Sequence, residues 1–423
     1  MRSRSPHTAT PSRHTLASVT PGNWRRERGA VLVNMAIALV GLVSFSAIVV
    51  DYGVLWSARR QAQNAADAGA MAAAVSLAYV DYNNRPLART AALNTARTNF
   101  IWGAVPDITD GDVDFPLCPP GAPGAGSDAC VRVSVFRNQR ANGNPLPTIF
   151  GRLIGVADQG VKATATAQVL WGDSADCVKP WAMPDKWIEY NPAATTWDPN
   201  DIFNRYSSQG ALLAPADYYQ PPGPGAMNND AGTGFTSRSV GVGGSDYGLQ
   251  ITLKPGNPGN AIGPGFFFPV VVEPDCTGGN CYSDAIAQCS PHLWGPHDEI
   301  TIEPGNMIGP TNHGVDLLVA QDPNASWNPS TNQIEGGCQA NNTCTKSPRL
   351  VAIPVFDVDE YDAGRASGRQ TLVITKILGF FIEGMNGNDV IGRLCYYPGP
   401  PRTRPGFDPI QASSFVISLA LVR

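Results

Sequence analysis

An uninterrupted apolar segment near the N-terminus limits what this chain can fold into more than any other feature. Residues 30–50 are 21 positions without a formal charge, preceded by Arg25, Arg26 and Arg28 and followed by Asp51. As a helix rising ~1.5 Å per residue, the segment spans ~31 Å, which matches the ~30 Å hydrocarbon core of a bilayer. The apolar part of a cleaved secretion signal is only ~7–15 residues long. The length therefore favours a permanent transmembrane anchor, here taken as residues 25–55.

The positive charges around this segment predict its orientation. Within twenty residues of the segment, four arginines lie on the N-terminal side and two on the C-terminal side: Arg13, Arg25, Arg26 and Arg28 against Arg59 and Arg60. Because the more basic flank of a membrane helix stays in the cytoplasm, we expect the N-terminus there. Residues 1–24, rich in Ser, Thr, Pro and Arg, are expected to form a disordered cytoplasmic tail. Everything after the anchor would then face the periplasm or the exterior.

The composition suits an exported chain. Charged residues make up only 15% of the 423 positions, whereas soluble domains average ~25%. The net charge of −5 predicts no bulk attraction to nucleic acid. All nine cysteines follow the apolar segment, on the side where disulfides persist. Three close pairs are candidate local bridges, although connectivity cannot be deduced from sequence: Cys118 with Cys130, Cys276 with Cys281, and Cys338 with Cys344.

The stretch after the apolar segment predicts that the membrane helix continues outward. Residues 56–78 contain no proline, one glycine and many alanines, a composition with high helix propensity. We therefore expect one helix of about fifty residues, whose outer half packs closely against a sheet or another helix because its side chains are small.

Both halves together carry a family resemblance. "ERGAVLVNMAIALVGLVSFSAIVVDYG" followed by "RRQAQNAADAGAMAAA" resembles the N-terminal module of the TadE/TadG-like proteins of the Flp (tight adherence, Tad) pilus system. The resemblance covers residues 25–78, about an eighth of the chain. The positions that match the family motif are Gly29, Asp51, Gly53, Gln63, Ala66 and Asp67.

The resemblance implies a non-enzymatic structural or assembly protein of a bacterial Flp (Tad) pilus. Such a protein would be a single-pass inner-membrane protein without a cofactor, with other Flp/Tad subunits and the cell envelope as partners. Gly29–Ala30 is the candidate processing step of related prepilins, which carry a glutamate at the fifth position after the cut. Asn34 occupies that position here, which favours an uncleaved anchor of the TadG type. The alternative is an anchored extracytoplasmic adhesin or binding module not tied to pili.

Downstream patterns predict an α+β fold in two parts. Residues 56–172 are expected to form a pilin-like module, because the long helix is followed by a second helix, a short helix and two alternating strands: 87–102, 148–155, 128–138 and 161–171. Residues 173–423 are expected to form a β-rich, Gly/Pro-rich exported domain with disulfides. Its strongest elements are a helix starting at Thr311 or Asn312 and four late β-like segments at 349–358, 370–385, 389–397 and 413–423.

Motifs for catalysis or metal binding are missing from the sequence. No D-x-S-x-S loop occurs, so a metal-dependent adhesin of the von Willebrand A type is not expected. Cys276, Cys281, Cys289, His292 and His297 are spaced unlike a standard zinc site, and disulfides are the better interpretation in an oxidising compartment. Hydrolase, Walker and dinucleotide-binding motifs are absent too. The sequence predicts no catalytic, cofactor-binding or metal-binding residue, which disfavours a periplasmic hydrolase.

Overall fold

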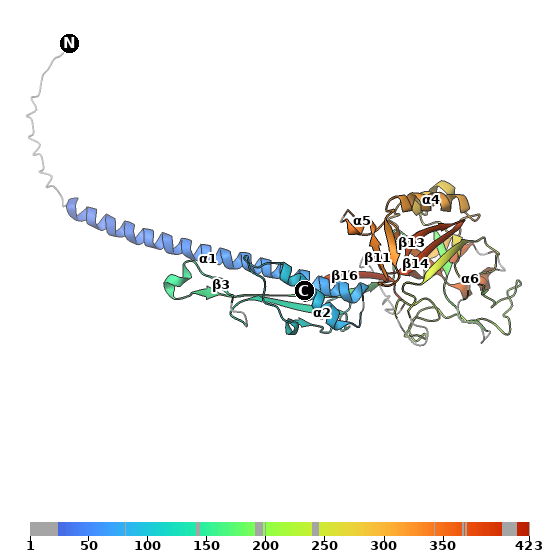
Figure 1. The fold of residues 1–423 in the computed structure, drawn as a ribbon, viewed down its shortest axis with the longest axis horizontal. Coiled ribbons are helices and arrows are strands. Elements are labelled where there is room, and N and C mark those ends of the chain that lie inside the picture. Colours follow the sequence, from blue (N-terminus) through green and yellow to red (C-terminus); the bar gives the residue numbers. More distant parts are fainter. Residues whose placement is uncertain are drawn as a thin grey trace, which may run out of the picture.

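The structure is a computed structural model in which one long helix leads to two folded regions (Figure 1). It describes residues 24–80, 82–140, 144–190, 198, 200–238, 245–341, 343–365, 368, 370–399 and 413–422. The expected tail, residues 1–24, therefore lies outside the described residues except for Trp24. The first region lies along the outer half of the long helix, and the second region, here called the head, lies beyond the end of that helix (Figure 1).

Helix α1 (Trp24–Tyr79) confirms the predicted continuous helix. Among the described residues it is the one helix that is long and apolar enough to cross a membrane, by length and composition. The side chains of residues 31–50 are exposed except that of Ala47, whereas the outer half is buried on one side. The same helix thus has a bare apolar half and a half that packs against the protein.

Helix α2 (Arg85–Thr98) packs across the outer half of α1. It begins where the side chain of Asn84 accepts a hydrogen bond from the Leu87 N–H, and Pro86 occupies the first turn, where a missing N–H costs nothing. Gly69 allows the close approach. A Cβ added there would lie 3.2 Å from both the Ala92 carbonyl oxygen and the Ala96 Cβ.

The first region has a five-stranded sheet in the order β1-β2-β5-β16-β15, with α1 packed against β2, β5 and β16. The alternation predicted for β2 and β5 is present. In β5, for example, Val161, Ala163 and Ala165 are buried, and the two residues between them are exposed. The short helix predicted over 148–155 is instead a single 3₁₀ turn, η2, because a glycine in the left-handed conformation, Gly155, ends it. The elements up to β5 are η1 (Asp110–Asp112), β1 (Val113–Asp114), β2 (Cys130–Arg137), β3 (Leu146–Pro147), η2 (Gly151–Ile154), β4 (Asp158–Gln159) and β5 (Val161–Gly172).

The last described strand corrects one expectation. The sequence predicts that the segment at 413–423 belongs to the head together with the other late strands. In the structure, β16 (Val416–Val422) instead pairs antiparallel with β5 of the first region. Val416 lies opposite Gly172 and Val422 lies opposite Thr166. β15 (Tyr397–Pro398) lies parallel to it at the edge of the sheet. Pairing at this range depends on the tertiary fold, so the strand pattern alone could not assign it. The predicted domain boundary between residues 172 and 173 stays a prediction. β16 follows this boundary in the sequence but pairs with a strand that precedes it.

The head is built on a closed ring of strands. The order is β12-β6-β8-β7-β14-β13-β9, and β12 also pairs with β13, which closes six of the strands into a barrel. Closure leaves the ring without free edges. The strands are β6 (Trp181–Pro184), β7 (Gln250–Pro255), β8 (Phe266–Pro269), β9 (Glu299–Thr301), β12 (Leu350–Phe356), β13 (Thr371–Asn386) and β14 (Asp389–Cys395).

Two aromatic-rich cores lie on opposite faces of these strands. In β12, Val351, Ile353 and Val355 belong to one core, whereas Ala352 and Phe356 belong to the other. This double burial explains why the late segments are nearly continuous apolar runs. The remaining head elements are α3 (Gly279–Ala287), α4 (Ile308–Ala320), β10 (Ala325–Asn328), β11 (Gln333–Gly336), α5 (Gly337–Ala340) and α6 (Val358–Arg365). The helix expected near Thr311 is α4, which starts one turn earlier.

Four disulfides cross-link the described residues. The first region has Cys118–Cys130. The head has Cys276–Cys281 and Cys338–Cys344, together with a bridge between distant residues, Cys177–Cys289. Two of the cysteines weighed as zinc ligands, Cys281 and Cys289, are therefore disulfide-bonded to different partners. Cys395 is free and buried.

Candidate functional site: the motif at the end of the apolar segment

Asp51, the residue that ends the apolar segment, binds a distant loop. Its carboxylate accepts backbone N–H groups from three consecutive residues: Ile149 at 2.8 Å, Phe150 at 3.1 Å and Gly151 at 2.7 Å. Charge-assisted hydrogen bonds of this kind are stronger than neutral ones. The side chain of Gln159 also donates to the Asp51 carbonyl oxygen. Asp51 therefore attaches residues 146–159, here called the lobe, to the helix.

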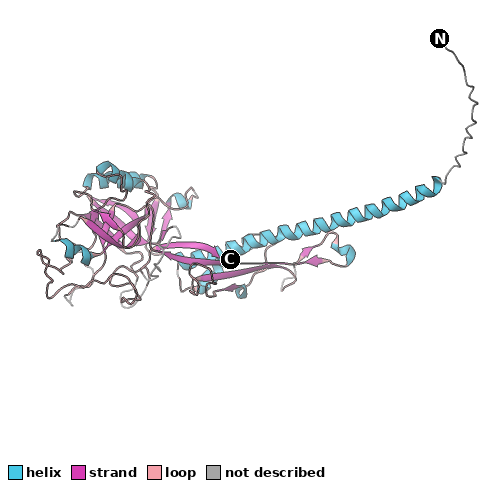
Figure 2. Cartoon of the chain, turned by 180° about the vertical axis from the view of Figure 1, so that it is seen from behind, coloured by secondary structure: helices cyan, strands magenta, loops and turns pink. Residues whose placement is uncertain are grey.

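The lobe is closed by its own hydrogen bonds. The Thr148 hydroxyl donates to the Val156 carbonyl oxygen at 2.5 Å, and the Val156 N–H donates to the Gly151 carbonyl oxygen at 2.9 Å. β3 and β4 pair at its base. In both ribbon views the lobe forms the end of the first region that points toward the bare half of α1 (Figures 1 and 2). Asp51 thus connects the bare half of α1 to the region that packs on its outer half.

Gln63 and Asp67 form the next contact along the helix. The Gln63 Nε2 donates to the Asp67 carboxylate at 2.7 Å, one helical turn away, and to the Thr164 carbonyl oxygen on β5 at 3.3 Å. Asp67 thereby holds the amide in the orientation that reaches the sheet. These two motif residues connect α1 to the middle strand of the first region.

Ala66 lies fully buried between these polar contacts. It belongs to a run of buried alanines on one face of α1, which packs against the small side chains of β5 and the valines of β2. Small residues let the helix axis lie close to the sheet, and larger side chains would overfill the space. The alanine-rich part of the motif is therefore a packing surface inside this chain.

The motif glycine Gly53 has no such role. A Cβ added there would meet nothing within 4 Å. Gly29 lies within α1, beside Ala30 of the candidate processing step. The contacts of this chain account for Asp51, Gln63, Ala66 and Asp67, and they do not account for Gly53.

The far end of α1 meets the head through aromatic rings. Tyr79 packs edge-on against Tyr396, with ring centroids 6.2 Å apart. Arg238 lies over two rings of the first region, 4.0 Å from the Tyr82 centroid and 4.4 Å from the Trp171 centroid. Burial, and then the hydrogen bond to Asp128, raises the pKa of Tyr82 to about 12. Sequence analysis missed this junction, because no local pattern links Arg238 to rings so far away in the chain.

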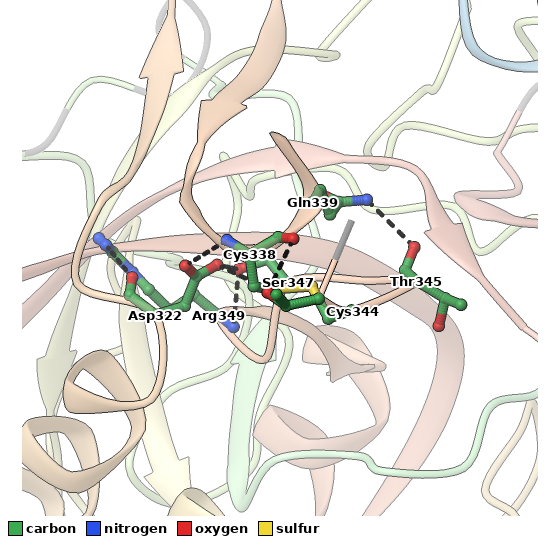
Figure 3. The surroundings of a disulfide bond; sticks show 8 residues. Asp322, Cys338, Gln339, Cys344, Thr345, Ser347 and Arg349 are labelled. Atoms are coloured by element: carbon green, nitrogen blue, oxygen red, sulfur yellow. Dashed lines mark hydrogen bonds between the residues drawn. A yellow bond between two sulfur atoms is a disulfide. The ribbon is translucent and has the colours of Figure 1, made fainter. Parts of the chain in front are cut away.

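The head encloses a polar cluster around one disulfide (Figure 3). Asp322 accepts the Cys338 N–H at 2.9 Å and the Ser347 hydroxyl at 2.5 Å. The buried Arg349 guanidinium donates to four backbone carbonyl oxygens, those of Asp322, Ala325, Ile382 and Glu383. Each group in the cluster has a partner within it, as expected of a structural network.

Among the residues that the structure describes, no group of three or more His, Cys, Asp or Glu side chains has the geometry to hold a metal ion. The site that the structure does assemble is the row of motif contacts along α1, which positions the two regions relative to the apolar segment.

Comparison with known proteins gives a match, and it falls on helix α1. Residues 29–76 match the model of the TadE/G-like Flp pilus-assembly family. Searches of curated proteins and of solved structures returned no match. The matched residues cover the bare half of α1 and nearly all of its packed half, including every motif residue discussed above. Over residues 29–76, this chain is similar to the TadE/G-like Flp pilus-assembly family.

Proposed function

We propose that this protein is a non-catalytic, membrane-anchored assembly subunit of a Flp (Tad) pilus, of the TadG type. The observation that carries the proposal is the match over residues 29–76, because it falls on the apolar segment and on the contacts that mount the folded regions on it. An assembly subunit needs a rigid connection between membrane and partner-binding surface rather than an active site.

In this proposal residues 30–50 cross the bacterial inner membrane once, with the N-terminus in the cytoplasm. The arginine bias supports that orientation. The first region and the head then lie on the periplasmic side, where the four disulfides are stable. Other Flp/Tad subunits and the cell envelope are the proposed partners.

The contacts of the first region supply the mechanism. Asp51 fixes the lobe to α1, Gln63 fixes strand β5 to α1, and the Tyr79–Tyr396 contact joins the far end of α1 to the head. Because α1 is one unbroken helix from Trp24 to Tyr79, the orientation of the head follows that of the membrane segment. The protein would hold its partners by non-covalent docking at a defined distance from the membrane.

Deletion and complementation test the proposal. We expect deletion to abolish surface pili, seen by electron microscopy. The full chain should restore them, and a chain with residues 25–50 replaced by a cleavable secretion signal should not. The secreted variant must accumulate to the same level with oxidised disulfides, so that misfolding does not explain its failure. Normal piliation after deletion would refute the proposal; normal piliation with lost surface attachment would favour the alternative, an anchored adhesin.

Mass spectrometry of the mature N-terminus tests the uncleaved anchor. Recovery of residues before Gly29 from the membrane fraction is expected. A mature chain that starts at Ala30 would instead show prepilin-type processing. A start beyond Val50 would show secretion, and would remove the anchor from the proposal altogether.

A further inference from the structure

The lobe packs against the last turns of the apolar segment. Ala47 is only 8% exposed, whereas Val43 is 52% and Ile48 is 67% exposed. Ala47 and Asp51 are four residues apart and therefore share one face of α1, the face on which η2 contacts the helix. Ala47 lies three residues inside the apolar segment, which corresponds to about 5 Å of helix. The lobe therefore reaches the level at which the apolar segment ends.

Apolar side chains are exposed on the lobe at this level. Ile149 is 57% and Val156 is 47% exposed. Ile149 also donates its backbone N–H to Asp51, so its position relative to the end of the apolar segment is fixed. Arg152, between them in the chain, is exposed as well. Apolar side chains beside a cation suit the boundary between acyl chains and phosphate headgroups.

Several backbone N–H groups of the lobe are paired within the lobe or with α1. Ile149, Phe150 and Gly151 donate to Asp51, Gly155 donates to the Arg152 carbonyl oxygen, and Val156 donates to that of Gly151. Backbone groups left unpaired would make entry into a membrane unfavourable, because lipid offers few partners. These five bonds reduce that cost.

Amphipathic aromatic residues lie near this level on another side of the helix. Tyr52 is 65% and Trp56 is 54% exposed, and Arg60 stacks over the Trp56 ring. At 3.6 residues per turn and ~1.5 Å per residue, they lie about 100° and 140° around α1 from Asp51, and about 2 Å and 8 Å further along its axis. Tyr and Trp gather at membrane interfaces, which are several ångströms deep. Exposed residues on two sides of α1 within this depth fit a lipid surface better than a protein docked on one side.

We propose that the lobe is a second membrane contact, which embeds Ile149 and Val156 in the outer boundary of the bilayer and places Arg152 at phospholipid phosphates. The proposal rests on the proposed membrane crossing of residues 30–50. With two contacts, α1 and the lobe, the first region cannot rotate or tilt freely on the membrane.

Photocrosslinking in the full chain tests the lobe. The chain with p-benzoylphenylalanine in place of Ile149 is reconstituted in vesicles of phosphatidylethanolamine and phosphatidylglycerol, irradiated and analysed by mass spectrometry. Leu117 is the matched control, since it is 66% exposed but lies beside Cys118, at the end of the first region far from Asp51. We expect phospholipid adducts at position 149 several-fold above those at 117. A second probe at Val156 should behave like that at 149.

The outcomes separate the lobe from the anchor. Carbonate extraction first establishes whether the chain stays in the membrane, and a native Cys118–Cys130 bridge establishes that each variant has folded. A chain that stays in the membrane but gives equal adducts at 149 and 117, or only protein adducts at 149, overturns the lobe contact and leaves the anchor intact. A folded chain that is extracted overturns both.

Discussion

The two regions of this molecule become rigid by different means. The first region is held by close packing of small residues, with fully buried alanines of α1 against β2 and β5, and by one disulfide. The head uses large aromatic side chains, buried polar groups, a closed ring of strands and three disulfides. Small side chains let α1 lie close to its sheet, whereas the head, built from loops and short strands, is held by cross-links. The following substitutions test this contrast.

The largest expected effect comes from the disulfides. The Cys177–Cys289 bridge joins residues 112 apart, and the Cys118–Cys130 bridge joins residues 12 apart. The loop-entropy relation predicts a loss of about 5 kcal/mol for Cys177→Ser with Cys289→Ser, and about 3 kcal/mol for the pair in the first region. Urea unfolding of the full chain in detergent, followed by amide exchange in each region, measures both. Equal losses would remove this part of the contrast.

Arg349→Met should destabilise the head by ~3–5 kcal/mol, because it leaves four backbone carbonyl oxygens without their charged donor. Arg393→Met is the control. Arg393 pairs with Glu383 in a more exposed position, so its loss should cost under ~1 kcal/mol. Amide exchange in β12 and β13 reports the effect. A small change at Arg349 would mean that the aromatic cores alone hold the head.

Ala66→Leu should destabilise the first region by ~1–3 kcal/mol, since a larger side chain overfills the space between α1 and the sheet. Asn64→Leu, on the exposed side of the same helix, should change stability by less than ~0.5 kcal/mol. Exchange of the β2 and β5 amides distinguishes them. If both variants behave alike, close packing is not what holds the sheet.

A further expected effect is a pH dependence specific to the head. Lys179 donates to the carbonyl oxygens of Ala285 and Gln288 at the end of α3. Burial, and then the charge of Lys346, lowers the pKa of Lys179 to about 7. The unfolded chain keeps this proton up to ~10.4, so stability should rise between pH 7 and ~10, by at most ~1.4 kcal/mol per pH unit. Lys179→Met should flatten that slope, and Lys254→Met, at an exposed lysine, should not.

Sequence reasoning predicted the elements whose signals are local. The apolar segment and the alanines after it predicted α1. The alternation of apolar and polar residues predicted β2 and β5. The family resemblance also predicted the motif residues of the α1 site, but it did not predict which residues they contact. Asp51 contacts Ile149, Arg238 contacts Tyr82, and β16 pairs with β5, each across a long stretch of chain. Contacts of this kind depend on how the elements pack together, which no window of sequence records.

The position of β16 sets an order for folding. During synthesis, α1 and β5 are made early, but the strand that covers one side of β5 is made after all the other described elements. Until then β5 presents an open row of backbone hydrogen-bonding groups, which invites pairing with other chains. The first region therefore reaches its final form only after β16 has been made. A chain that lacks β16 would leave one edge of β5 unpaired.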